Sequence, residues 1–161
     1  MKNLFAYLLL VFGIITSGCE NKNIETAEKK DDLPVNFDCI NQMADKPLLV
    51  DVAKKKMIGE WQLKQIATML PSKTVPDIKV VFSGSDKVEV YENGKLKYGT
   101  DYSLKQENID KTPMVTLETK EIKLAEGDYK FLFGAIRVCD KELLIDNGMA
   151  FDAPAYFFVK K

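Results

Sequence analysis

The sequence predicts an all-β fold: a small eight-stranded antiparallel up-and-down barrel, with short helical turns ahead of it. Apolar and polar residues alternate with a period of two in most segments after residue 57, and Gly-containing turn signals such as Asn93-Gly94 separate several of these segments. The chain shows no long amphipathic helical pattern. Because nearly every connection has the length of a hairpin, consecutive strands are expected to pair, and closure of the sheet removes its exposed edges. A two-sheet sandwich is the structural alternative.

The strand pattern occurs in eight short segments. These segments are 57–64, 78–83, 87–92, 95–105, 115–120, 129–138, 143–145 and 156–159. Asn93-Gly94, between the third and the fourth, is the strongest hairpin signal, because both central residues of such a turn must adopt positive φ. Both the odd-numbered and the even-numbered positions of the segment 129–138 are mostly apolar, which predicts a strand covered on both faces. Short helical turns are expected at 37–44 and 52–57.

The first 18 residues have the layout of a secretory signal, with Lys2 followed by an apolar run over 4–15. The run is shorter than the about 20 apolar residues that span a bilayer. The tripeptide that ends at Cys19, Ser-Gly-Cys, resembles the lipobox of bacterial lipoproteins. That resemblance implies that Cys19 becomes the lipidated first residue of the mature chain. Thr16 departs from the usual Leu, and an ordinary signal peptide or an uncleaved anchor is the alternative.

The segment after Cys19 differs in composition from the rest of the chain. Residues 20–32 contain many acids and lysines and no aromatic residue, so the segment buries too little apolar surface to offset the entropy of ordering. The chain therefore divides into a lipoprotein signal peptide (1–18), a flexible tether (19–36) and a β-barrel domain (37–161).

The predicted lipid places the protein in the cell envelope and makes the membrane an expected partner, beside a possible small apolar ligand. Glu20, rather than Asp, follows the lipidated cysteine, and by resemblance to other lipoproteins this favours the outer membrane, on either face. A formal net charge of −1 without a basic cluster argues against nucleic acid as a partner. The sequence leaves any protein partner open.

With Cys19 lipidated, Cys39 and Cys139 remain. An even pair of cysteines in an exported chain suggests a disulfide, which would tie the start of the domain to a late strand. Closing a loop of about 100 residues stabilises a fold by roughly 4–5 kcal/mol in the chain-entropy model. Two separate buried thiols are the alternative.

The Gly59-Glu60-Trp61 tripeptide opens the first predicted strand and is followed by a meander. This arrangement resembles the Gly-x-Trp motif of lipocalin-like domains in bacterial lipoproteins, and the resemblance covers roughly 39–161. The motif is short and also opens other small β domains, including heat-shock-associated lipoprotein domains. Lipocalins commonly stack an Arg near the final strand on this Trp. The single Arg of this chain, Arg137, lies earlier, and it would close the barrel against Trp61 or pair with Asp140 or Glu142.

The composition argues against an enzyme. The chain has no His, the usual general base and the commonest zinc ligand. A disulfide would remove the remaining thiolates as nucleophiles. The cluster of Asp146, Asn147 and Asp152 lacks the ligand ladder of a calcium loop and has the composition of a plain turn. No cofactor and no metal site are expected.

Binding is the favoured class of function. The strand positions predicted to point into the barrel include aromatic residues, which would either line a cavity there or fill the interior. They are Trp61, Phe82, Tyr98, Tyr102, Phe131, Phe133, Tyr156 and Phe158. The sequence therefore favours a membrane-anchored lipoprotein that binds a small hydrophobic or amphipathic ligand in the cell envelope. The alternative is a non-catalytic protein-interaction module, either an inhibitor or an accessory subunit of an envelope complex, with a filled core.

Overall fold

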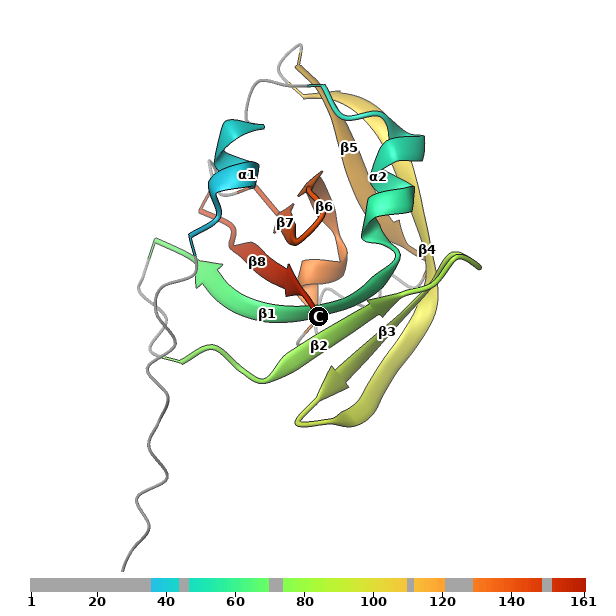
Figure 1. Ribbon diagram of the computed structural model, residues 1–161, viewed down its shortest axis with the longest axis vertical. Helices are drawn as coiled ribbons and strands as arrows, with labels where there is room; N and C mark the ends of the chain where they lie inside the picture. Colours follow the sequence, from blue (N-terminus) through green and yellow to red (C-terminus); the bar gives the residue numbers. More distant parts are fainter. Residues whose placement is uncertain (1–35, 44–46, 70–73, 110–111, 121–128, 149–151) are drawn as a thin grey trace, which may run out of the picture. The chain divides into compact units, whose positions relative to one another are not determined.

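The strands form a closed antiparallel barrel in the order β1 to β8, with β8 paired back to β1 (Figure 1). The structure is a computed structural model that describes residues 36–43, 47–69, 74–109, 112–120, 129–148 and 152–161. The predicted leader, Cys19 and nearly all of the tether lie outside these residues. Every described element belongs to the compact unit Pro34–Lys161.

Each strand pairs with its neighbours in sequence, which confirms the predicted up-and-down barrel and excludes the sandwich. The strands are β1 Gly59–Ala67, β2 Ile78–Phe82, β3 Lys87–Glu92, β4 Lys95–Ile109, β5 Thr112–Thr119, β6 Gly134–Val138, β7 Glu142–Asp146 and β8 Ala155–Lys160. The Asn93-Gly94 turn joins β3 to β4 with φ of 51° and 73°, as its residue types require. Closure is completed by pairs such as Leu63 with Phe158.

The segment 129–133 is not a strand, in contrast to the prediction. It contains a 3₁₀ helix, η2 Lys130–Leu132, and β6 begins only at Gly134. Phe131 and Leu132 are both buried, so the segment inserts two consecutive side chains into the core. An alternating strand would direct one of them to each face of the sheet. The odd and even positions at the start of the segment 129–138 are therefore both apolar because a turn inserts its side chains into the core, and not because a strand is covered on both faces.

Two short helices cover different parts of the barrel. α2 Val50–Met57 contacts β4 and β6, and its Ala53 and Met57 belong to the interior core. Met57 therefore ends this helix, where the sequence pattern placed the start of a strand. α1 Asp38–Gln42 contacts β7 and adds Ile40 to a second apolar cluster outside the barrel. No helix in the described part of the chain is long and apolar enough to cross a membrane.

The strand register gives the barrel two different ends. α2 precedes Gly59, so it lies at the end where β1 begins and where β2 turns into β3. At the other end lie the Asn93-Gly94 turn, the last residues of β1 and the first residues of β8. We call this second end the turn end of the barrel.

Candidate functional site

Most of the aromatic residues predicted to point inward lie in the interior core. The buried ones are Trp61, Phe82, Tyr102, Phe131 and Phe158. Phe131 packs edge-on against Phe158 with their ring centroids 5.7 Å apart, and Phe82 packs against Tyr102 at 5.2 Å. These rings, together with Leu132 from η2 and Met57 from α2, occupy the barrel interior along much of its length.

Phe133 differs from this expectation, because its side chain is 51 % exposed. The 3₁₀ turn of η2 ends directly before Phe133, so residues 131 and 133 do not point to the same side as they would in a strand. Its ring therefore faces solvent and takes no part in an interior site.

Half-buried tyrosines gather towards the turn end of the barrel. The rings of Tyr98 and Tyr129 stack with centroids 5.8 Å apart and an interplanar angle of 21°. Tyr129 and Tyr156 each contact buried Phe131 edge-on, at 5.9 and 5.5 Å. Burial raises the pKa of Tyr156, so its phenol is a neutral donor at physiological pH. Ring contacts thus connect the partly exposed tyrosines with the core.

Tyr129 is the member of this cluster that sequence reasoning does not place in the site. Its position in the apolar run 129–138 indicates that Tyr129 is at least partly buried. The alternation of side chains along a strand cannot predict the 3₁₀ turn that brings Tyr129 against Tyr98.

A lysine, Lys160, lies over the Trp61 ring in place of the expected Arg137. Trp61 is fully buried, and its Nε1 donates a hydrogen bond of 2.6 Å to the carbonyl of Met57. Lys160 Nζ lies 5.0 Å from the Trp61 ring centroid and donates to the Lys56 carbonyl at 3.0 Å. At Gly59, with φ of 129°, a Cβ would lie only 2.8 Å from Lys160 Cε. Gly59 therefore makes room for the lysine stem.

Arg137 lies on the opposite face of the sheet from Trp61. It pairs in register with Leu144, which belongs to the outer cluster under α1, and paired residues of antiparallel strands share a face. The carboxylates considered as its partners have other contacts: Asp140 bonds to Lys56 at 2.5 Å, and Glu142 accepts the Ile40 N–H at 3.0 Å. Lys160 lies in the final strand, which is where the lipocalin resemblance puts the cation stacked on the Trp. Its place in the sequence is therefore the signal that could have pointed to Lys160 instead of Arg137.

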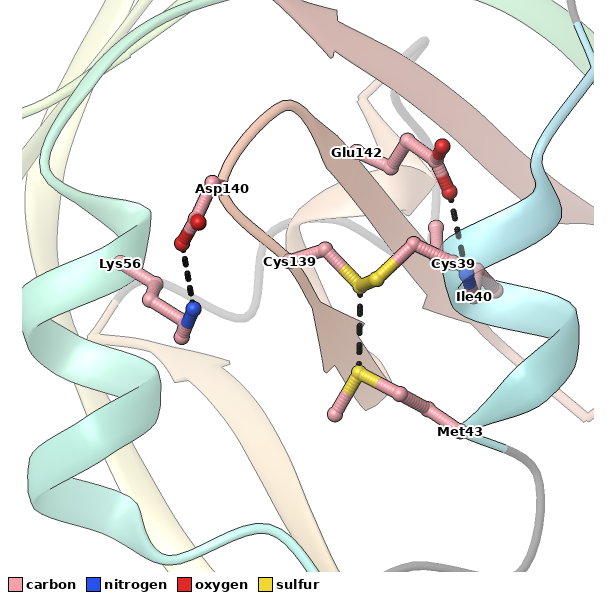
Figure 2. The surroundings of a disulfide bond; sticks show 7 residues. All are labelled: Cys39, Ile40, Met43, Lys56, Cys139, Asp140 and Glu142. Atoms are coloured by element: carbon pink, nitrogen blue, oxygen red, sulfur yellow. Dashed lines mark hydrogen bonds and ion pairs between the residues drawn. A yellow bond between two sulfur atoms is a disulfide. The ribbon is translucent and has the colours of Figure 1, made fainter.

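A disulfide joins Cys39 of α1 to Cys139, which follows β6, with the two Cα atoms 6.4 Å apart (Figure 2). It lies beside a groove of about 340 Å³. The groove is lined by Cys39, Met43, Pro47, Leu48, Leu49, Val52, Lys56, Cys139 and Asp140. The hydrogen bond and charge of Lys56 hold the pKa of the Asp140 carboxyl below its usual range, so this carboxyl is charged at neutral pH.

The Asp146 segment has the geometry of a turn in its described part. Asp146 Oδ1 accepts the Gly148 N–H at 2.8 Å, the local bond by which Asp side chains stabilise turns. Residues 149–151 lie outside the described part.

Comparison of the chain with protein-family models, with curated proteins and with solved structures finds no match.

Proposed function

We propose that this protein is a membrane-anchored lipoprotein of the cell envelope whose lipocalin-like barrel binds a small hydrophobic or amphipathic ligand. The ligand lies at the turn end of the barrel, and the protein acts by binding rather than by catalysis. The observation that supports this most is the continuous set of ring contacts from half-buried Tyr98 and Tyr129 to buried Phe131.

The chemistry of this cluster suits a partly apolar ligand. The ring faces offer apolar area, and tyrosine hydroxyls offer polar groups that can orient one end of the ligand. Phe131 and Leu132 occupy the interior, so the ligand packs against the half-buried tyrosine rings that contact Phe131 rather than passing along the barrel axis. A compact or planar molecule matches the stacked tyrosine rings better than a long acyl chain does.

A fluorescence titration tests this proposal. The segment 34–161, which contains every described element, is titrated with N-phenyl-1-naphthylamine, a dye that brightens in apolar surroundings. We expect saturable binding of one dye per chain, weakened by Tyr98→Ala. Tyr91→Ala is the matched control, because Tyr91 bonds to Glu89 on the outer surface and should leave binding unchanged. Unsaturable binding, or equal binding by both variants, would contradict the proposal.

The second candidate function is the protein-interaction module, which the groove beside the disulfide favours. Leu49 is 65 % exposed and Val52 is 40 % exposed, and both line this groove. Apolar side chains that gather at a groove with polar neighbours are typical of an interaction surface.

Photocrosslinking tests the second candidate. A photoreactive residue in place of Leu49 should form an adduct with one protein in intact cells, whereas the same residue at Leu96, an exposed position on β4, should not. Equal labelling from both positions would eliminate a specific partner at the groove.

A further inference from the structure

Three sulfur atoms meet beside the groove. Met43 Sδ lies 3.1 Å from Cys139 Sγ, which is bonded to Cys39 Sγ (Figure 2). A disulfide sulfur carries no proton, so this approach is a packing contact rather than a hydrogen bond. A carboxylate oxygen of Glu142 lies within 4.8 Å of both cysteine sulfurs. Met43 and Glu142 lie on opposite sides of the disulfide in Figure 2.

The disulfide is not the only link that holds α1 against the barrel. Ile40 is buried in the outer cluster, and its N–H donates to Glu142. Just ahead of α1, the Phe37 ring contacts the Phe157 ring of β8 at a centroid distance of 4.9 Å. These contacts do not depend on the sulfur–sulfur bond. These contacts would therefore keep the thiols of Cys39 and Cys139 near each other and near Met43 after reduction.

The residues that carry the three sulfur atoms line the groove. Its lining includes both cysteines and Met43, together with Lys56 and Asp140.

We propose that reduction of the disulfide converts this cluster into a site for monovalent copper, with the thiolates of Cys39 and Cys139 and the thioether of Met43 as its ligands. A thiol or phosphine reductant supplies two electrons and is itself oxidised, while two protons convert the disulfide into two thiols. Binding of one Cu(I) then releases those two protons to solvent, because thiolates rather than thiols bind metal. Soft thiolate and thioether sulfurs together select Cu(I) over hard cations.

Glu142 acts in this proposal as a positioning residue. Its carboxylate bonds to the backbone of α1 and so keeps Cys39 and Met43 in place. A zinc site would instead use this carboxylate as a ligand, because zinc prefers cysteine, histidine and carboxylate ligands to thioethers. The roles of Met43 and Glu142 therefore distinguish the two metals.

Competition with the Cu(I) chelator bathocuproine disulfonate tests the proposal. The full chain carries Cys19→Ser, so that Cys39 and Cys139 are its only cysteines. It is purified in detergent, reduced with a phosphine, desalted without oxygen and given one equivalent of Cu(I). We expect the reduced protein to retain the copper and the oxidised protein to lose it. X-ray absorption should show three sulfur neighbours.

Three variants make the test specific. Met43→Leu should lower the Cu(I) affinity at least about tenfold, since even outer-shell partners of a metal change its affinity on that scale. Met69→Leu, at an exposed methionine, should leave the affinity unchanged. Glu142→Gln keeps an acceptor for the Ile40 N–H and should retain copper. Equal retention by oxidised and reduced protein, no effect of Met43→Leu, or preferential zinc binding that needs Glu142 would each overturn the proposal.

Discussion

At the scale of single residues, Lys160 joins β8 to β1 and α2 at the end of the barrel where β1 begins. Its ammonium lies over the Trp61 ring and bonds to the last turn of α2, while its stem passes the space left by Gly59. A cation over a buried indole is favourable by about 0.5–2 kcal/mol. The same side chain therefore fixes β8, β1 and α2 relative to one another.

Replacing Lys160 with Met should lower the free energy of unfolding by about 1 kcal/mol, because the stem is kept while the cation–π contact and the bond to the Lys56 carbonyl are lost. Urea unfolding followed by Trp61 emission measures the change. Lys161→Met is the matched control, since Lys161 is exposed at the neighbouring position. Equal stability of the two variants would show that the Lys160 ammonium contributes nothing to barrel closure.

At the scale of elements, Gly134 allows η2 to pass into β6. Its φ is 129°, and a Cβ there would lie less than 3.0 Å from backbone atoms of Asp146. The close approach places the start of β6 against the end of β7 and directs Phe131 into the core. Only glycine meets both requirements.

Gly134→Ala should destabilise the barrel by about 1–3 kcal/mol through backbone strain alone, and the contact with Asp146 adds to this. Chemical denaturation measures the loss. Gly84→Ala is the control, because its nearest neighbour would be a side-chain carbon of Ile58 at 3.9 Å and its backbone is not in the strained region. A Gly134→Ala protein as stable as Gly84→Ala would refute this role of Gly134.

Asp101 links β4 on the outer surface with β3 and with the residue that follows β5. It accepts hydrogen bonds from Lys87 at 2.9 Å and from Lys120 at 3.1 Å, so it connects β3, β4 and the residue that follows β5. These bonds, with that of Lys87 the strongest influence, hold the pKa of the Asp101 carboxyl below its usual range. A pKa lowered in the folded state adds stability above the unfolded-state pKa, and this stability is lost as the pH falls through the folded-state value.

Lys87→Met should therefore raise the Asp101 pKa towards its ordinary range. A carboxyl-detected NMR titration of Asp101 measures this shift. Lys95→Met, at an exposed lysine on β4, serves as the control and should leave the Asp101 pKa unchanged. The difference should shrink at high salt because exposed ion pairs are screened. An unchanged Asp101 pKa in Lys87→Met would show that the ion pair does not form in solution.

The regular strands were predictable from sequence because their side-chain period is set by local backbone geometry. Trp61 and Phe82 could be assigned to the core on that basis alone. The side-chain period could not reveal η2, since burial of Phe131 and Leu132 depends on the close approach of the Gly134 backbone to the Asp146 backbone, which is distant in sequence. The position of Lys160 over Trp61 likewise depends on the pairing of β8 with β1, which local patterns do not encode.

At the scale of the whole molecule, the two ends of the barrel have different roles in the proposed function. Trp61, Lys160 and α2 close one end. Half-buried tyrosines towards the other end lie over a core that Phe131 and Leu132 already occupy. A tether from the membrane would keep such a binding domain where apolar and amphipathic molecules are concentrated.

Native mass spectrometry of the full chain isolated from membranes tests the binding proposal most directly. The proposal predicts one small molecule bound non-covalently per chain, which is lost on denaturation and is absent from the Tyr98→Ala protein. A protein with the same mass before and after denaturation, with no small molecule released, would contradict it.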